Sequence, residues 1–148
     1  MLRWAFILWL AMQHRLSSVD RLLVWGIVAE VSCVLCNSGN VESHNHLFFD
    51  CPYSSAIWAD MLTKNQVCRY PMQWDDEMIW FNLHSKGNCL RKSVLKLSLS
   101  AAVYGIGREG NARIFQQRSM DSVFASAKSY LAVTAKWCNV WNLTRLHH

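Results

Sequence analysis

The chain has 148 residues, which is enough for one domain with a modest core and too few for a polymerase with palm, fingers and thumb. Its formal net charge of +5 is unevenly placed. Residues 1–87 carry six Lys or Arg against eight Asp or Glu, a net −2, whereas residues 88–148 carry nine against two, a net +7. Attraction to nucleic-acid phosphate would therefore have to come mainly from the second half.

Apolar residue types make up 52% of the chain, which contains eight tryptophans and six cysteines. So much indole in a short chain predicts a packed interior, an aromatic surface that awaits a partner, or both. Cys68, Cys89 and Cys138 are scattered and have no partner at short spacing. Such cysteines are typical of reduced thiols, so we expect an intracellular protein of the nucleus or cytoplasm rather than a secreted one.

The first segment, Met1 to Met12, is nearly all apolar and predicts a buried helix. Polar and charged residues follow it where a signal peptide would have a small-residue cleavage site. The segment is also shorter than the roughly 20 residues that a membrane span needs, so we expect no membrane association. Ser17 or Ser18 can cap a second short helix from Val19 to Trp25, which Gly26 would end as a C′ glycine.

Between residues 33 and 51, three cysteines and a histidine have spacings that suit one tetrahedral metal ion. Cys33 and Cys36 form a Cys-x2-Cys pair, whose two-residue spacer makes a tight turn that aims both sulfurs at one point. His46 and Cys51 form a His-x4-Cys pair that supplies the other half. Three thiolates and one imidazole fill all four positions and leave none for water or substrate. We therefore predict one structural Zn²⁺ bound by these four residues.

Two other interpretations of this stretch stay open from the sequence. Free cysteines are common in cores, and a histidine beside aromatic residues is more often buried and hydrogen-bonded than bound to a metal. His44 could also replace His46 as the fourth ligand, although the last spacer would then grow to six residues. The metal is favoured by a polar turn at residues 37–40 and by Cys51, which precedes a helical pattern, because the positive end of a helix dipole favours a thiolate.

After the histidine, Leu47-Phe48-Phe49 are expected to be extended and packed under the metal. Pro52 begins a third helix, where its missing N–H costs nothing. Three apolar residues recur at four-residue spacing on the inner face of this helix, namely Tyr53, Ile57 and Met61. Residues 64–72 read as a polar connector, and Trp74 to Leu83 as a short helix with acidic residues in its first turn.

Two long helices are predicted in the rest of the chain. The first has a narrow apolar stripe that consists of Leu90, Val94, Leu97, Ala101 and Tyr104. Continuing the stripe would bury Arg108, and a buried unpaired guanidinium is costly. We therefore expect this helix to bend or end among the three glycines between residues 105 and 110. The second long helix runs from Met120 to Trp141.

The sequence around the metal ligands resembles a known family. The residues that carry the likeness are Cys33-x2-Cys36, Glu42-Ser43-x-x-His46-Leu47-Phe48-Phe49-x-Cys51-Pro52 and Ile57-Trp58. Over about residues 3–62 the chain is similar to the zinc-binding domain that follows the reverse transcriptase in plant non-LTR retrotransposons. Further on, Arg108-Glu109 with Asn111-Ala112-Arg113-Ile114-Phe115 resembles that family's trailing Trp-x-Glu-Arg-Asn motif, with Gly107 and Gly110 in place of its Trp and Arg. The resemblance implies a domain that helps a reverse transcriptase to hold template RNA or target DNA.

No residue pattern indicates catalysis. A reverse transcriptase needs paired aspartates on a strand turn, and the nearest tripeptide, Trp58-Ala59-Asp60, lies in a helical pattern without a partner. Asp75-Asp76-Glu77 is the only acidic run, and the first turn of a helix explains it. We expect a protein that is not an enzyme and has no small-molecule substrate.

The leading hypothesis is a zinc-stabilised module, derived from a non-LTR retrotransposon reverse transcriptase polyprotein, that binds RNA or single-stranded DNA. Exposed tryptophans would stack on unpaired bases. Five basic residues would contact phosphates: Arg91, Lys92, Lys96, Arg113 and Arg118. A solvated basic surface explains the same five residues equally well. The rival hypotheses are a protein-interaction module for a missing polymerase domain and a degenerate fragment with no selected role.

The predicted fold class is mainly α, a small helical domain built around a Cys3His zinc knuckle with little or no β structure. We expect three parts along the chain. Residues 1–65 form the zinc-binding domain, residues 66–88 a connector with a short helix, and residues 89–148 a basic helical region that packs on the first part.

Overall fold

The computed structural model describes residues 2–16, 18–27, 32–36 and 38–116. Its elements are the helices α1 (Leu2–Met12), α2 (Val19–Val24), α3 (Pro52–Lys64), α4 (Trp74–His84) and α5 (Leu90–Gln116), with a π-helical turn η1 (His46–Asp50) between α2 and α3. Within these ranges the β structure amounts to an isolated bridge between Ser32 and Val41. The mainly helical class is therefore confirmed. The helix predicted from Met120 to Trp141 lies outside the described residues.

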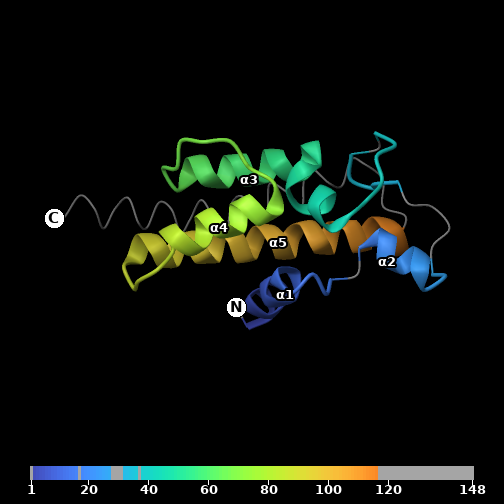
Figure 1. Cartoon of the computed structure of the whole chain (residues 1–148), viewed down its shortest axis with the longest axis horizontal. Helices are drawn as coiled ribbons and strands as arrows, with labels where there is room; N and C mark the ends of the chain where they lie inside the picture. The colour runs from blue at the N-terminus through green and yellow to red at the C-terminus, as the bar shows by residue number, and fades with distance from the viewer. Residues whose placement is uncertain (1, 17, 28–31, 37, 117–148) are drawn as a thin grey trace.

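The long helix α5 is the element on which the others are assembled. It packs against α1, α3 and η1, and Figure 1 shows α3 and α1 on opposite sides of it. Its inner face is a row of buried residues spaced four, three and four apart: Leu95, Leu99, Ala102 and Ile106. These residues share one core cluster with Trp58, Met61 and Leu62 of α3. No helix in the described ranges is long and apolar enough to cross a membrane.

The predicted stripe of α5 was right for Val94 and Ala101, which are buried, but not for Leu90, and the predicted end of the helix was wrong. Leu90 is 51% exposed, and the buried face of α5 is rotated around the helix axis relative to the predicted stripe. The helix also continues through all three glycines to Gln116. With this buried face, the Arg108 side chain is exposed. The cost of burying its charge, which we expected to end the helix, therefore does not arise.

Helix α1 is only half buried, which corrects the expectation of a buried helix. Ala11 is buried, and Ile7 and Leu8 pack against the core. The opposite face carries Phe6 and Trp9, which are 57% and 50% exposed and stack at 6.2 Å between ring centroids. The described fold therefore has an aromatic surface on the outer side of α1.

Helix α2 is capped by a residue far along the chain. Ser18 occupies the N-cap position, but its side chain makes no capping hydrogen bond. The N–H of Val19 donates instead to Oε1 of the buried Glu42 at 3.2 Å. Gly26 follows the helix with φ of +71°, the left-handed conformation predicted for a C′ glycine. The Glu42 cap ties α2 to the segment that leads into η1.

Helix α3 begins at Pro52 as predicted, but its inner face differs from the predicted one. The buried residues of α3 are Ser54, Trp58, Met61 and Leu62. Tyr53 and Ile57 lie at the margin of the core. The connector to α4 is fixed by an ion pair, since Arg69 donates to both carboxylate oxygens of the buried Glu77 at 3.0 and 2.5 Å.

Candidate metal centre

The structure brings Cys33, Cys36, His46 and Cys51 together. One possible ligand atom from each of them lies within 4.8 Å of the others. The Sγ atoms of Cys33 and Cys51 are 3.9 Å apart, and Cys36 Sγ is 3.4 Å from His46 Nε2. A tetrahedral zinc ion with ordinary bond lengths requires about 3.8 Å between two sulfurs and about 3.6 Å between sulfur and nitrogen. The donor set and its spacing therefore fit one zinc ion.

The first two candidate ligands, Cys33 and Cys36, lie where the chain reverses its direction. The N–H of Cys33 donates to the carbonyl of Asn40 at 2.8 Å, beside the bridge between Ser32 and Val41. Gly39 has φ of +73°, which lets the chain reverse where a side chain would be strained. The hydrogen bond with Cys51 and burial raise the pKa of the Cys33 thiol, and the backbone N–H groups of Leu35 and Cys36 inside the turn act in the opposite direction. The backbone thus presents partial positive charge to the thiolate that zinc requires.

The other two ligands are joined by the π turn η1, where the sequence led us to expect an extended segment. The N–H of Cys51 donates to the carbonyl of His46 at 2.7 Å, an i to i+5 bond. In a regular α-helix, residues five apart are rotated by about 140° around the axis, which would separate the two ligands. The wider turn brings them to the same side. Burial of Leu47, Phe48 and Phe49 agrees with the sequence prediction.

His44 lies in a different environment from His46. Its ring centroid is 4.4 Å from that of His14, 4.5 Å from Trp74 and 5.0 Å from Phe48. These contacts place His44 in an aromatic cluster beside α4. The four-residue group that could hold a metal contains His46. Of the two histidines that the sequence left in competition, His46 is the one with ligand geometry.

Electrostatics in the metal-free cluster favour a thiolate at Cys51. Both Cys33 and Cys51 are buried, and the Cys33 thiol donates a hydrogen bond to Cys51 Sγ. This bond, together with backbone N–H groups of Ser54 and Tyr53 at the start of α3, lowers the pKa of Cys51 to about 5. The same bond, together with burial, raises the pKa of Cys33. A zinc ion would therefore displace the proton that the two sulfurs share.

Three of the predicted phosphate contacts gather at the N-terminal end of α5. Arg91 and Lys96 are exposed and Lys92 is half-buried. Lys92 Nζ donates to the carbonyl of Lys86, and Lys96 Nζ to the carbonyl of Gly87 at 3.3 Å. We call Lys86, Arg91, Lys92 and Lys96 the basic end. The sequence from residue 78 to residue 108 contains no Asp or Glu, so no acidic residue close in the sequence offsets this charge.

Arg113 does not fit the phosphate-binding role that the sequence suggested. Its side chain is 6% exposed, and Nε lies 3.1 Å from Oε1 of Glu109. Its Nη1 donates to the carbonyls of Val34 and Leu35 at 2.7 and 3.0 Å. A phosphate could reach this guanidinium only by breaking those contacts. Arg118, the fifth predicted contact, lies outside the described residues.

Sequence reasoning missed the pairing of Glu109 with Arg113. The available signal was their i, i+4 spacing within a helix, with the acidic residue first, which is the favourable order for such a pair. That signal does not distinguish a solvated pair from a buried one. The contact with the Cys-x2-Cys turn spans 79 residues and carries no local signal.

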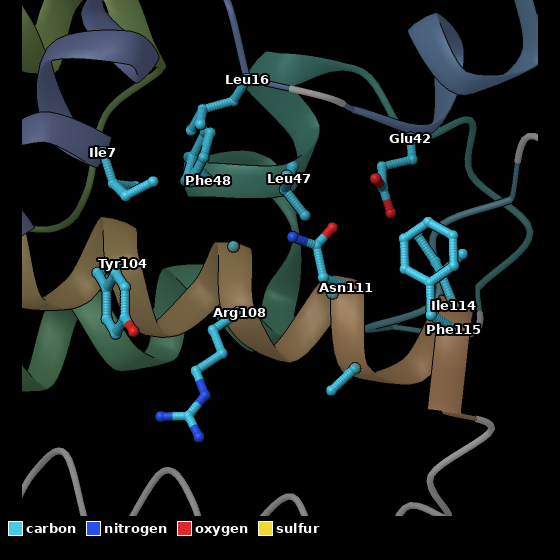
Figure 2. A pocket seen from close by; sticks show the side chains of 13 residues that line it. Ile7, Leu16, Glu42, Leu47, Phe48, Tyr104, Arg108, Asn111, Ile114 and Phe115 are labelled. Atoms are coloured by element: carbon cyan, nitrogen blue, oxygen red, sulfur yellow. The ribbon is translucent and has the colours of Figure 1, made fainter. Parts of the chain in front are cut away.

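A cavity of about 430 Å³ lies beside the π turn. Its walls combine apolar side chains with Glu42 and Asn111, and Figure 2 shows the Arg108 side chain pointing away from the others. Leu47 and Phe48 line it. Because these two residues belong to the same turn as His46, η1 contributes residues both to the cavity and to the metal cluster.

Comparison with known proteins bears on the first part of the chain. Residues 1–58 match a family model described as zinc-binding in reverse transcriptase. All four residues of the metal cluster lie inside this match. It supports a reverse transcriptase zinc-binding domain here. No curated protein and no solved structure matches the chain.

Proposed function

We propose that the chain is a non-catalytic, zinc-stabilised module that binds RNA or single-stranded DNA and derives from the reverse transcriptase polyprotein of a non-LTR retrotransposon. The observation that carries the proposal is the Cys3His cluster, whose donor atoms lie within 4.8 Å of one another, with two separations close to those of a tetrahedral zinc site. The family match over residues 1–58 supports the link to reverse transcriptase.

A structural role for the zinc follows from its donor set. Four protein ligands leave no coordination position for water or substrate, which a catalytic zinc needs. The ion would join the Cys-x2-Cys turn, the π turn and the start of α3. Leu35, Phe48 and Cys51 from these three segments are buried in the core, so the ion would hold core residues in place.

The basic end supports the nucleic-acid part of the proposal. Lysine and arginine side chains gain affinity for nucleic acid by neutralising phosphates and releasing counterions. Arg91 and Lys96 project from α5 into solvent, where a phosphate backbone can reach them. The exposed rings of Phe6 and Trp9 on α1 offer a surface on which unpaired bases can stack. Stacking on these rings requires unpaired bases, so this second contact type suits a single strand better than a duplex.

A second candidate function is contact with a polymerase domain, and the outer face of α1 favours it. Phe6, Trp9 and Met12 form an apolar surface on one helix, with Met12 46% exposed. Such a surface on a soluble domain is typical of a site that another protein covers. The two functions differ in salt dependence, because phosphate contacts weaken with ionic strength and apolar contacts do not.

The test measures binding of the zinc-loaded chain to labelled single-stranded RNA and DNA by fluorescence anisotropy over a salt series. The variant Arg91→Gln, Lys92→Gln, Lys96→Gln should lower the slope of log affinity against log salt by about 2, since each lost phosphate contact on a single strand contributes about 0.7. Zinc content and melting temperature of the variant should stay near those of the wild type.

The matched control is Arg3→Gln, Arg15→Gln, Arg21→Gln, which removes the same charge away from the basic end. If the slope falls equally in the two triple variants, the effect comes from net charge and not from the basic end. Binding without any salt slope would contradict the proposal and favour the polymerase-contact function.

A further inference from the structure

We propose that Arg113 is a positioning residue for the metal site, because its guanidinium holds the two peptide groups that present their N–H groups to the Cys33 sulfur. The inference rests on the proposed zinc site and adds a residue outside the matched region to it. Arg113 stands on α5, 62 positions after Cys51 in the sequence. Its role is argued from the geometry of the peptide groups between Cys33 and Cys36.

Two peptide groups lie between the guanidinium and the sulfur. Arg113 Nη1 donates to the carbonyl of Val34 at 2.7 Å and to that of Leu35 at 3.0 Å. The Val34 carbonyl belongs to the same planar peptide group as the Leu35 N–H, and the Leu35 carbonyl to the same group as the Cys36 N–H. Those two N–H groups face the Cys33 thiol and favour its charged form. In a trans peptide the C=O and N–H bonds point in opposite directions, so the cation and the sulfur lie at opposite ends of both groups.

This arrangement gives Arg113 two effects on the metal ligand. The two hydrogen bonds fix the orientation of both peptide planes, so that their N–H groups face the sulfur before a metal arrives. A cation at the carbonyl oxygens also polarises each peptide group, which strengthens the N–H to sulfur bonds at its other end. Hydrogen bonds to a thiolate stabilise its charged form, the form that binds zinc. Outer contacts of this kind tune metal affinity in other sites.

Arg113 is itself held in place from α5 and α3. Glu109, one turn earlier on α5, accepts from its Nε at 3.1 Å, and the Glu109 side chain is only 7% exposed. The ring of Tyr53, next to Pro52 at the start of α3, lies 5.3 Å from the guanidinium carbon. A buried charge is costly unless it is paired and hydrogen-bonded. The pairing with Glu109 and the two carbonyls therefore explains how an arginine can be buried here, and it fixes the guanidinium against the turn.

The experiment compares metal binding by the wild-type chain with that of Arg113→Gln, using zinc competition and cobalt(II) as a spectroscopic probe. We expect zinc affinity to fall about 10- to 100-fold, the loss typical of an outer contact to a metal ligand. We also expect the sulfur-to-cobalt charge-transfer band to move to longer wavelength, because a thiolate with weaker N–H donors gives up an electron more easily.

The control is Arg69→Ala, which breaks the ion pair of Arg69 with the buried Glu77 of α4 and removes no contact to the Cys-x2-Cys turn. It should destabilise the fold while leaving the cobalt spectrum unchanged. If Arg113→Gln fails to fold, the double variant Glu109→Gln, Arg113→Gln removes the orphaned carboxylate and should show the same spectral shift. An unchanged spectrum, with a loss of zinc affinity no larger than that of Arg69→Ala, would overturn the role of Arg113 alone. A wild-type chain that binds neither zinc nor cobalt would overturn the zinc site as well.

Discussion

Removing the metal should destabilise the chain by an amount set by the free zinc concentration. A ligand that binds only the folded state stabilises it by RT ln(1 + [Zn]/Kd). Structural zinc sites in small domains have apparent binding free energies of about 10–16 kcal/mol, which correspond to Kd values from about 50 nM to about 2 pM. At about 1 µM free zinc, the predicted stabilisation of this chain is therefore about 2–8 kcal/mol.

We expect the chain to fall within this range, because all four candidate ligand atoms already lie together in the folded protein. Little folding energy is then needed to assemble the site. Above the Kd, each tenfold increase in free zinc should add about 1.4 kcal/mol if one ion binds. At about 4 °C per kcal/mol for a domain of this size, even the lower bound gives a rise of about 8 °C in Tm.

The assay is thermal unfolding in zinc buffers that span three decades of free metal. Cys36→Ser should strongly weaken the dependence of Tm on zinc, because one thiolate is lost and water would have to take the fourth position. Cys89→Ser is the matched control, since Cys89 is an exposed free cysteine outside the cluster. A wild-type Tm that does not change with zinc, or a Cys36→Ser variant that keeps the full dependence, would refute the reasoning.

Two further predictions concern ligand choice and the glycines. His46→Ala should abolish the dependence of Tm on zinc, whereas His44→Ala should keep it and lower Tm through lost aromatic contacts; the reverse pattern would mean that the ligand assignment is wrong. Gly107→Ala should raise the free energy of unfolding by about 0.5–1 kcal/mol, because no atom lies within 4 Å of the added Cβ and Gly is a poor helix former. Gly26→Ala should lower it by about 1–2 kcal/mol, because φ there is +71°. Urea denaturation measures both glycine effects, and equal signs would contradict them.

The four residues of the candidate metal site could be predicted from the sequence because their spacing along the chain is characteristic of zinc ligands. Cys33 and Cys36 need only a tight turn between them, and few other arrangements suit that spacing. The shape of the second half could not be predicted in the same way. Three consecutive apolar residues, Leu47 to Phe49, fit a buried strand and a buried helical turn equally well. The widened turn is visible only in the i to i+5 hydrogen bond from Cys51 to His46.

The inner face of α5 shows a second limit. The predicted stripe through Leu90 and Leu97 and the observed row through Leu95 and Leu99 both have helical periodicity. Which row turns inward depends on the positions of α1 and α3, and these are set by tertiary packing. The role of Arg113 was hidden for the same reason, since its partners Val34 and Leu35 lie far away in sequence.

The core of this protein extends beyond the residues that the family model matches. The match ends at Trp58, in the middle of α3, yet Trp58 shares a core cluster with Leu99 and Ile106 of α5. A fragment cut at the edge of the match would sever α3 and leave the π turn without the helix that covers it. Expression limits chosen by likeness alone would thus cut through one core cluster and expose to solvent the apolar side chains of the matched part that pack against α5.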